Sequence, residues 1–429
     1  MEKRNNIPKL RFPEFSDVWK VNPLGDVMDF KVTNSFSRDN LNYDNGTIKN
    51  IHYGDIHTKF QTLFDITKEL IPFINEDISI NRISEDFYCK EGDIIFADAS
   101  EDLNDVGKSI EIINLNNERL LSGLHTLLSR PKENTFSKGF GGYLFKSNCV
   151  RLQIQKESQG SKVLSINVGR ISNIILSFPS LPEQQKIATF LSTVDEKLQT
   201  LKKKKSLLET YKKGVMQKLF SQQIRFKDDE GNVLEDWEVK TLGELGNTYG
   251  GLSGKSKENF GKGKPYIQYK QIFDDSKIDI SRFELVEIGE NETQNRVQFG
   301  DVFFTVSSET PNEIGMSSVL LNEIEELYLN SFCFGFRANS LNELSPYFSK
   351  YLFRSKMFRT EIIKLAQGST RYNMSKIQLL KIEIQLPKLS EQTKIANFLT
   401  AMDEKINKVD TQIKQTELWK KGLLQQMFV

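Results

Sequence analysis

The chain has 429 residues, of which 38% are hydrophobic and 27% charged, enough for two or three domains that each bury a core. Its 58 Lys and Arg are balanced by 57 Asp and Glu, so binding to nucleic acid would have to rest on local basic patches. Cys89, Cys149 and Cys333 are far apart, and no run of eighteen apolar residues occurs. These features argue against a disulfide framework, a zinc site, export and a membrane span, and favour the cytoplasm.

Residues 1–180 are predicted to form a mixed domain of strands and a few helices. Short β-rich runs such as DIIFADA, residues 93–99, alternate with Gly, Asn and Asp, which favour turns. The only histidines, His52, His57 and His125, lie outside any metal-binding or catalytic motif. We expect them to be ordinary loop or core residues.

Residues 181–222 are predicted to form one long amphipathic helix that begins near the Leu-Pro pair at 181–182. Apolar residues recur every seven positions, which is typical of a coiled-coil seam. They are Ile187, Val194, Leu201, Leu208 and Val215. At 1.5 Å per residue the helix would be roughly 55 Å long.

Residues 223–388 are predicted to form a second mixed domain, with β-rich runs such as DVFFTV at 301–306. The segment Gly250–Ser256 approaches a phosphate-binding loop, but Tyr249 stands where that motif requires Gly, so nucleotide binding is not expected. A local basic patch follows, with a weaker counterpart between Lys146 and Arg170. Its members are Lys350, Arg354, Lys356, Arg359, Lys364, Arg371 and Lys376.

Residues 389–429 are predicted to form a second long helix with the same heptads, in which only Thr416 is not apolar. The seam of one helix supplies the partner for the other. We predict antiparallel packing that buries a common set of residues, namely Ile187, Val194, Leu201, Ile395, Met402 and Val409. Acids of the Asp-Glu-Lys runs at 195–197 and 403–405 are expected on a solvated face and not in a nuclease site.

The second half of the chain repeats the first. LPEQQKIATFLSTVDEKL from Leu181 matches LSEQTKIANFLTAMDEKI from Leu389, so Glu391 lies 208 positions after Glu183. The same offset relates Gln159-Gly160-Ser161 to the QGS at 367–369 and Gly92-Asp93 to the Gly-Asp at 300–301. Two copies are too few for a solenoid and indicate a pseudo-twofold molecule with two similar domains.

Two mixed domains, each followed by a helix that opens with EQ-x-KIA-x-FL and carries DEK, resemble the specificity subunit of type I restriction-modification systems. The resemblance covers essentially the whole chain. It implies two target recognition domains and two antiparallel spacer helices, with the recognition domains reading a bipartite, asymmetric site in double-stranded DNA. It also implies two methyltransferase subunits and restriction subunits as partners, which would hold the S-adenosylmethionine, ATP and Mg²⁺ that this chain does not bind.

Residues that differ between the two copies inside matched segments are the candidates for reading bases. After the shared QGS the first copy has Lys162 to Ser165, whereas the second has residues 370–373. Of these, Arg371 suits a guanine edge and Asn373 an adenine edge. This segment could equally be only the cap of a following helix. Variable early loops lie at 50–60 and 268–273. The DNA-binding candidates are Lys108, Lys162, Ser165, Arg170, Lys270, Gln271, Asn312, Arg354, Lys356, Arg359, Arg371, Tyr372, Asn373 and Lys376.

Aromatic residues toward the flank of the helix seam are candidates for binding a partner protein, because they leave apolar surface beside the coiled coil. They are Phe190, Tyr211, Phe398 and Trp419. No catalytic or metal-binding residue is predicted. Two other functions stay open at this point: a stand-alone nuclease or methyltransferase with an unfamiliar motif, and a coiled-coil adaptor that does not bind nucleic acid.

Overall fold

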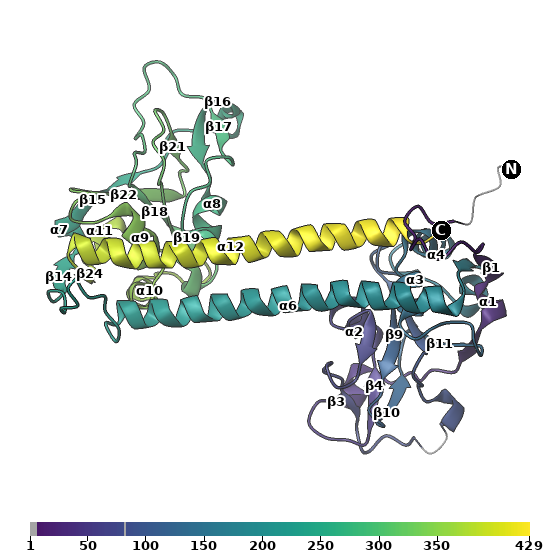
Figure 1. The fold of residues 1–429 in the computed structure, drawn as a ribbon. Coiled ribbons are helices and arrows are strands. Elements are labelled where there is room, and N and C mark those ends of the chain that lie inside the picture. Colours follow the sequence, from purple (N-terminus) through teal and green to yellow (C-terminus); the bar gives the residue numbers. More distant parts are fainter. Residues whose placement is uncertain (1–6, 81–82) are drawn as a thin grey trace. The chain divides into compact units, whose positions relative to one another are not determined.

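The computed structural model describes residues 7–80 and 83–429, which belong to two compact units. Unit 1 comprises Met1–Lys203 and Thr411–Val429, and unit 2 comprises Lys204–Asp410. Two long helices, α6 (Leu181–Phe220) and α12 (Leu389–Gln426), contribute residues to both units. Each unit therefore consists of one mixed α/β domain together with part of each long helix (Figure 1).

Unit 1 is organised around a sheet with the strand order β2-β11-β7-β9-β5 and a smaller sheet with the order β10-β4-β6-β3. Two short antiparallel pairs, β1-β13 and β8-β12, complete it. The strands are β1 (Lys20–Pro23), β2 (Met28–Lys31), β3 (Leu41–Asn42), β4 (Ile48–Ile51), β5 (Leu63–Asp65), β6 (Phe73–Ile74), β7 (Ile94–Ala97), β8 (Ala99–Ser100), β9 (Ser109–Asn114), β10 (Arg119–Ser122), β11 (Thr126–Pro131), β12 (Leu164–Ser165) and β13 (Ile175–Phe178). Its shorter helices are α1 (Leu24–Val27), α2 (Tyr53–Thr58), α3 (Phe140–Leu144), α4 (Asn148–Glu157) and α5 (Val168–Ile171).

Unit 2 repeats this plan, with a central sheet in the order β15-β22-β18-β20 and a second sheet in the order β17-β16-β21. The pairs β14-β24 and β19-β23 correspond to β1-β13 and β8-β12. The strands are β14 (Glu238–Thr241), β15 (Gly246–Gly250), β16 (Phe260–Ile267), β17 (Glu284–Val286), β18 (Val302–Thr305), β19 (Ser307–Ser308), β20 (Ser317–Val319), β21 (Tyr328–Leu329), β22 (Cys333–Ala338), β23 (Tyr372–Asn373) and β24 (Glu383–Leu386). Its shorter helices are α7 (Leu242–Leu245), α8 (Tyr269–Asp274), α9 (Pro346–Leu352), α10 (Lys356–Lys364) and α11 (Lys376–Leu380).

The central sheet of each unit separates two hydrophobic cores. Successive side chains of a strand point to opposite faces, so Ile94 and Phe96 of β7 join the core that includes Leu191 of α6, whereas Ile95 packs with Ile56 of α2 on the other side. Strand β18 likewise divides its side chains between the two cores of unit 2. This arrangement explains why strands β7 and β18, at the centre of the two β-rich runs, are buried along their whole length.

The two long helices run antiparallel where they meet within each unit. In unit 1, Asp195 pairs with Lys420 and Lys202 pairs with Glu417, so the residue number rises along one helix as it falls along the other. In unit 2 the same order is seen in the ion pairs Lys205–Asp410 and Lys212–Asp403. The antiparallel prediction is confirmed.

All but one of the predicted seam residues are buried. Ile187, Val194, Ile395, Met402 and Val409 are buried, and Leu201 is half-buried. Thr416, the one polar heptad residue, is also buried. Its hydroxyl donates to the carbonyl of Gln412 one turn earlier, which satisfies the hydroxyl without a partner across the seam.

The repeated Glu-Gln pair ties each long helix to the start of its own domain. Glu183 is buried and accepts hydrogen bonds from Arg11 and Trp19, and Glu391 accepts the corresponding bonds from Arg225 and Trp237. The neighbouring glutamine side chains, Gln184 and Gln392, bind the carbonyl before the helix entrance and an amide of the segment that precedes α3 or α9. The motif is therefore a structural junction that holds helix and domain together.

The prediction of a solvated face for the Asp-Glu-Lys runs holds for Glu196 and Glu404, which are exposed, but is wrong for Asp195 and Asp403, which are half-buried. Asp195 accepts a hydrogen bond from the Tyr143 hydroxyl of α3 at 2.9 Å in addition to its ion pair with Lys420. Asp403 accepts from the Tyr351 hydroxyl at 2.7 Å and pairs with Lys350. The heptad rule places position 195 beside the seam, where the tyrosine and the lysine can both reach it.

Candidate nucleic-acid interface

Segments of unit 1 that are far apart in sequence meet at the pair β8-β12. Ser165 pairs with Ala99, and the His57 ring at the end of α2 hydrogen-bonds the Ala99 carbonyl at 3.0 Å. The Lys108 ammonium donates to the His57 carbonyl at 2.9 Å and to Asp105 at 3.0 Å. We call this region reading surface 1; it comprises 52–57, 98–108, 125 and 162–165.

The same construction in unit 2 gives reading surface 2, which comprises 268–269, 306–316, 332 and 370–373. Asn373 pairs with Ser307, and the Tyr269 hydroxyl donates to the Ser307 carbonyl at 2.7 Å. The Arg371 guanidinium donates to the Ser307 hydroxyl at 3.2 Å while its side chain stays exposed. The segment after QGS is therefore a strand on a surface as well as the approach to α11.

The structure brings together several of the predicted DNA-binding residues. Lys108, Lys162 and Ser165 belong to reading surface 1, where Lys162 and Ser165 are exposed. Asn312, Arg371, Tyr372 and Asn373 belong to reading surface 2, where all but the half-buried Tyr372 are exposed. In each unit the segment after QGS and the variable early loop, both chosen from the sequence, thus meet beside the pair β8-β12 or β19-β23.

Two candidates have structural roles instead. Gln271 is buried, and its side-chain amide donates to the Arg282 carbonyl, so the prediction that it contacts DNA is wrong. It lies on the inner face of α8, whereas Lys270 beside it is exposed and pairs with Asp274. Arg170 pairs with Glu157 and donates to its carbonyl, which fastens α5 to the end of α4.

Arg354 and Arg359 also brace the fold. The Arg354 guanidinium donates to the carbonyls of Ser317, Ile272, Phe273 and Asp275 at 2.7–3.1 Å. Arg359 donates to the carbonyls of Asn312 and Gly315, which shapes the loop of reading surface 2. Burial lowers the pKa of each guanidinium to about 10. Two nitrogens of each guanidinium donate to backbone oxygens, so a phosphate contact predicted from the charge pattern is not supported by this geometry.

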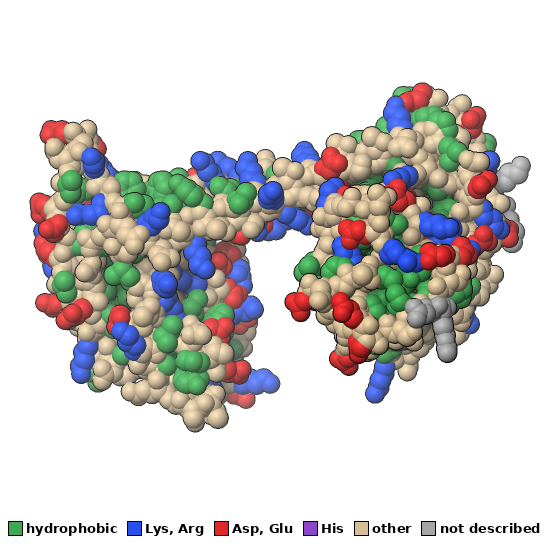
Figure 2. All heavy atoms as spheres, turned by 90° about the horizontal axis from the view of Figure 1, so that it is seen from below, with side chains coloured by type: hydrophobic (Ala, Val, Ile, Leu, Met, Phe, Trp, Pro, Cys, Tyr) green, Lys and Arg blue, Asp and Glu red, His purple; other side chains and the backbone are tan. Residues whose placement is uncertain are grey.

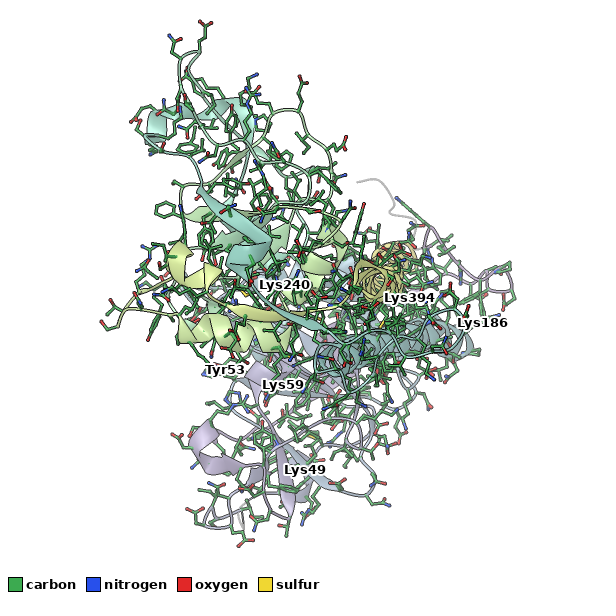
Figure 3. The ribbon with its side chains drawn as sticks, turned by 90° about the vertical axis from the view of Figure 1, so that its left-hand side faces the viewer. Lys49, Tyr53, Lys59, Lys186, Lys240 and Lys394 are labelled. Atoms are coloured by element: carbon green, nitrogen blue, oxygen red, sulfur yellow. The ribbon has the colours of Figure 1, made fainter. Side chains whose placement is uncertain are left out.

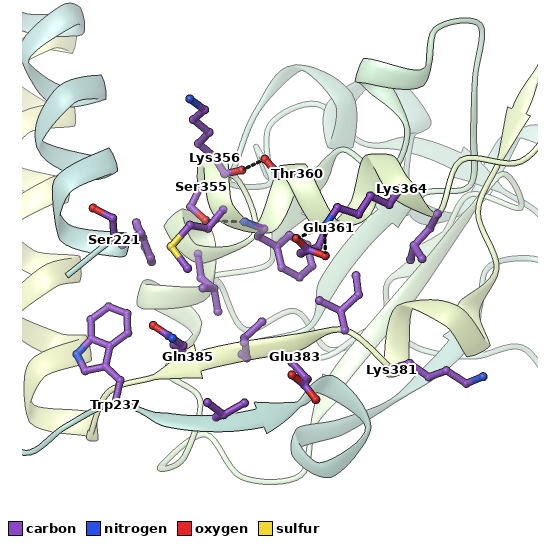
Figure 4. A pocket seen from close by; sticks show the side chains of 18 of the residues that line it. Ser221, Trp237, Ser355, Lys356, Thr360, Glu361, Lys364, Lys381, Glu383 and Gln385 are labelled. Carbon is purple, nitrogen blue, oxygen red and sulfur yellow. Dashed lines mark hydrogen bonds and ion pairs between the residues drawn. The ribbon is translucent and has the colours of Figure 1, made fainter. Parts of the chain in front are cut away.

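Lys356 lies on a groove of about 780 Å³ in unit 2, between α10, β24 and the end of α6 (Figure 4). Trp237, Phe358 and Ile384 line its apolar part, and Glu361 pairs with Lys364 at the rim. Lys376 extends over the Phe334 ring at 5.9 Å and is half-buried. Among the described residues no group of His, Cys, Asp and Glu could hold a metal ion.

Charge on the faces drawn in Figure 2 is mixed, with basic and acidic side chains interspersed on each unit. Figure 3 labels Tyr53 and Lys59 at the two ends of α2 and Lys49 on β4 of the same unit. Lys59 is paired with Asp55, and Lys49 is paired with Glu118. These two basic side chains are thus held by acidic neighbours.

Comparison with known proteins agrees with the repeated architecture. The family model described as type I restriction modification DNA specificity domain matches residues 16–210 and again residues 234–417. The chain belongs to this type I DNA specificity family. The double match covers both domains and the first part of both long helices, as the internal repeat requires.

Individual relatives match over long stretches. The MjaX type I restriction enzyme specificity subunit of Methanocaldococcus jannaschii is 27% identical over 440 residues, covering 98% of this chain and 95% of that protein. The MjaVIII specificity subunit of the same organism is 28% identical over 293 residues, covering 66% and 68%. A crystal structure of the type I restriction-modification S subunit from M. genitalium matches with a TM-score of 0.55 and 15% identity over 99% of both chains, which shows a shared fold.

The predicted partner-binding aromatics of this family member are unequally covered. Phe190 packs edge-on against Phe12 and against Trp419, and Phe398 packs against Phe226. Segments at the start of each domain therefore cover part of the two phenylalanines. Tyr211 and Trp419 are 59% and 48% exposed, so they retain the apolar surface that the heptad pattern predicts.

Sequence reasoning missed the contribution of the histidines. All three lie around Tyr53: the ring centroids of His52, His57 and His125 are 4.6, 5.9 and 5.3 Å from that of Tyr53. His52 caps α2 by accepting from the Gly54 amide, and burial lowers its pKa to about 4. His125 instead is exposed on reading surface 1. The sequence contains no spacing that would predict this cluster, because strand pairing assembles it.

Proposed function

We propose that this chain is the DNA-specificity subunit of a type I restriction-modification complex, and that each unit reads one half of a bipartite, asymmetric DNA site. One observation carries the proposal: the two units build the same surface from equivalent strands and place different side chains on it. A shared scaffold fixes the position of the backbone on DNA, and the differing side chains select different base edges.

The chain itself is proposed to be non-catalytic. The relatives named above are specificity subunits, so DNA methylation and cleavage would belong to partner subunits, together with S-adenosylmethionine, ATP and Mg²⁺. Asp195 and Asp403, the acids that could have suggested a nuclease site, each accept a hydrogen bond from a tyrosine hydroxyl and so have structural roles. Such a complex acts on chromosomal and invading DNA, so we expect the chain in the cytoplasm.

Two methyltransferase subunits are proposed to bind, one per repeat, near the ends of the long helices, with restriction subunits joining the complex. Tyr211 and Trp419 are exposed at equivalent positions of the two helices. Leu207 and Leu418, nearby in sequence, are also apolar and are 59% and 72% exposed. Native mass spectrometry of the co-expressed complex is expected to give two methyltransferases per specificity chain. A single methyltransferase at saturation would contradict the symmetry of this proposal.

Sequencing that detects methylated bases tests the function as a whole. A strain carrying this chain and its partner methyltransferase is expected to show one split motif with an unread gap, absent from the strain without this chain. Purified chain incubated alone with DNA and S-adenosylmethionine is expected to transfer no methyl group. Methylation or cleavage by the purified chain alone would instead identify a stand-alone enzyme, and binding without dependence on salt or sequence would contradict the reading role.

A further inference from the structure

His125 and Phe332 occupy the same backbone position in the two units. Each directly precedes the strand that pairs with the buried β7 or β18: Thr126 pairs with Ala97, and Cys333 pairs with Thr305. The His125 carbonyl accepts from the Asp98 amide at 3.0 Å, and the Phe332 carbonyl accepts from the Val306 amide at 3.1 Å. His125 and Phe332 are 207 positions apart, as are Arg130 and Arg337, whereas the repeated motifs are 208 positions apart. This difference of one residue conceals the equivalence in the sequence.

Both side chains are held out of their cores. The His125 side chain is 50% exposed, and Phe332 is 59% exposed although it is a large apolar residue beside a well-packed domain core. His125 also has a φ of 54°, in the left-handed region that a residue with a Cβ seldom adopts. Strain of this kind is retained where the surrounding structure requires a residue to point in a set direction.

The residues beside His125 and Phe332 also differ, and they differ in polarity in the same sense. Asp98 lies beside His125, with its carboxylate 3.2 Å from Nδ1 of the imidazole, whereas the equivalent neighbour of Phe332 is Val306. A polar pair in one unit therefore replaces an apolar pair in the other. Burial alone does not demand this exchange, because both side chains point outward from the same scaffold.

Both positions adjoin the segments that follow QGS. The Ile166 amide donates to the Asp98 carbonyl at 2.8 Å, directly after the exposed Ser165. The Met374 amide donates to the Val306 carbonyl at 2.9 Å, directly after Asn373. His125 thus shares reading surface 1 with Ser165, and Phe332 shares reading surface 2 with Arg371 and Asn373.

We propose that His125 and Phe332 are equivalent base-contacting residues, one in each half-site, and this inference rests on the proposed function. Phe332 contacts the C5 methyl group of a thymine in the major groove, where an apolar side chain recognises that group. His125 hydrogen-bonds a polar base edge through Nε2, and Asp98 fixes the ring by binding Nδ1. The same scaffold position therefore recognises a thymine methyl group in one half-site and a hydrogen-bonding base edge in the other.

The test compares the motifs selected by variants of the full chain in complex with its methyltransferase partner, using a library of random duplex DNA. His125→Gly removes the imidazole and accepts a φ of 54° without strain. Phe332→Ala removes the ring. Tyr347→Ala and Leu70→Ala are matched controls, because both residues are exposed apolar positions outside the reading surfaces. Thermal melting of each variant shows that the fold is kept.

Phe332→Ala is expected to lose preference at a single thymine of one half-site, and His125→Gly at a single position of the other half-site. Replacing that thymine by deoxyuridine, which lacks the methyl group, is expected to weaken the wild-type complex about fourfold and to leave the Phe332→Ala complex unchanged. Both controls are expected to select the wild-type motif.

The outcomes separate the two levels of inference. A wild-type complex that selects no motif would overturn the proposed function and this inference together. A wild-type split motif that folded His125→Gly and Phe332→Ala complexes select unaltered would overturn only the base-contacting role. The same conclusion would follow if both variants changed the same half-site, or if the position altered in Phe332→Ala were not a thymine.

Discussion

At the scale of single residues, the exposed side chains of the reading surfaces differ in kind from the buried cations behind them. Arg371 is exposed, and its guanidinium donates to the Ser307 hydroxyl. The Arg354 guanidinium donates hydrogen bonds to four backbone carbonyls. Charge alone does not distinguish the two arginines in a sequence, because the distinction is made by which carbonyls the fold brings within reach.

Replacing Arg371 or Asn373 by Ala is expected to cost about 1–3 kcal/mol of binding free energy for the cognate site, because a base-edge contact is lost. Discrimination should relax in one half-site only. Competition binding against duplexes with single substitutions measures this. Equal weakening on every sequence, with a smaller salt dependence, would show that these side chains contact phosphate instead.

Replacing Arg354 by Ala is expected to lower the free energy of unfolding of unit 2 by about 2–4 kcal/mol, since several backbone carbonyls, two of them in partly buried bonds, lose a charged donor. Denaturant melting of the full chain measures this loss. Lys270→Ala, which removes an exposed cation on α8, is the matched control and should stay within about 0.5 kcal/mol of the wild type. A folded Arg354→Ala chain of wild-type stability that binds DNA weakly would restore the phosphate role.

The buried Glu111 gives unit 1 a dependence on pH. Burial raises its pKa to about 7, although the amides of Gly139 and Gly142 donate to the carboxylate at 2.5 and 2.7 Å. The folded state therefore holds this proton up to about pH 7, whereas the unfolded state releases it near 4.5, the ordinary pKa of a glutamate side chain. The contribution of Glu111 to stability is present below pH 4.5 and is lost as pH rises to 7.

Thermal melting of the wild type and of Glu111→Gln at a series of pH values measures this effect. The melting temperature of the wild type, taken relative to the variant, is expected to fall between pH 4.5 and 7 and to stay level above that range. Parallel profiles of the two proteins across the range would show that Glu111 does not bind a proton differently in the two states.

At the scale of elements, the long helices could be predicted from the sequence and the strand pairing could not. Heptads are local, so Ile187 and Ile395 fix their seam within one helix each. The pair β8-β12 joins Ala99 to Ser165 across more than sixty residues of chain, and no local pattern specifies that pairing. The equivalence of His125 and Phe332 was hidden for the same reason. Their offset differs by one residue from that of the repeated motifs, and the equivalence is visible only when the strand partners are known.

The junction between helix and domain depends on one buried carboxylate per unit. Glu391→Gln is expected to lower the free energy of unfolding of unit 2 by about 3–5 kcal/mol, because the guanidinium of Arg225 would lose its charged partner. Glu404→Gln on the exposed side of the same helix is the control. Denaturant melting in which both variants unfold alike would show that the repeated Glu-Gln motif does not hold the helix to the domain.

At the scale of the whole molecule, the chain repeats one unit so that a shared scaffold carries two sets of side chains. The family match falls on each repeat separately, and each unit has its own cores and its own reading surface. Within the described ranges, none of the helices combines the length and the apolar character that a membrane span requires. Each half-site is therefore expected to be the property of one unit.

The most direct test of this claim is an exchange of residues 1–180 for the first recognition domain of another specificity subunit, followed by sequencing of methylated bases in a strain that also carries the methyltransferase. One half of the split motif is expected to change to that of the donor protein, while the half read by unit 2 stays the same. A motif in which both halves change together would contradict the account, because it would show that the two units read DNA jointly.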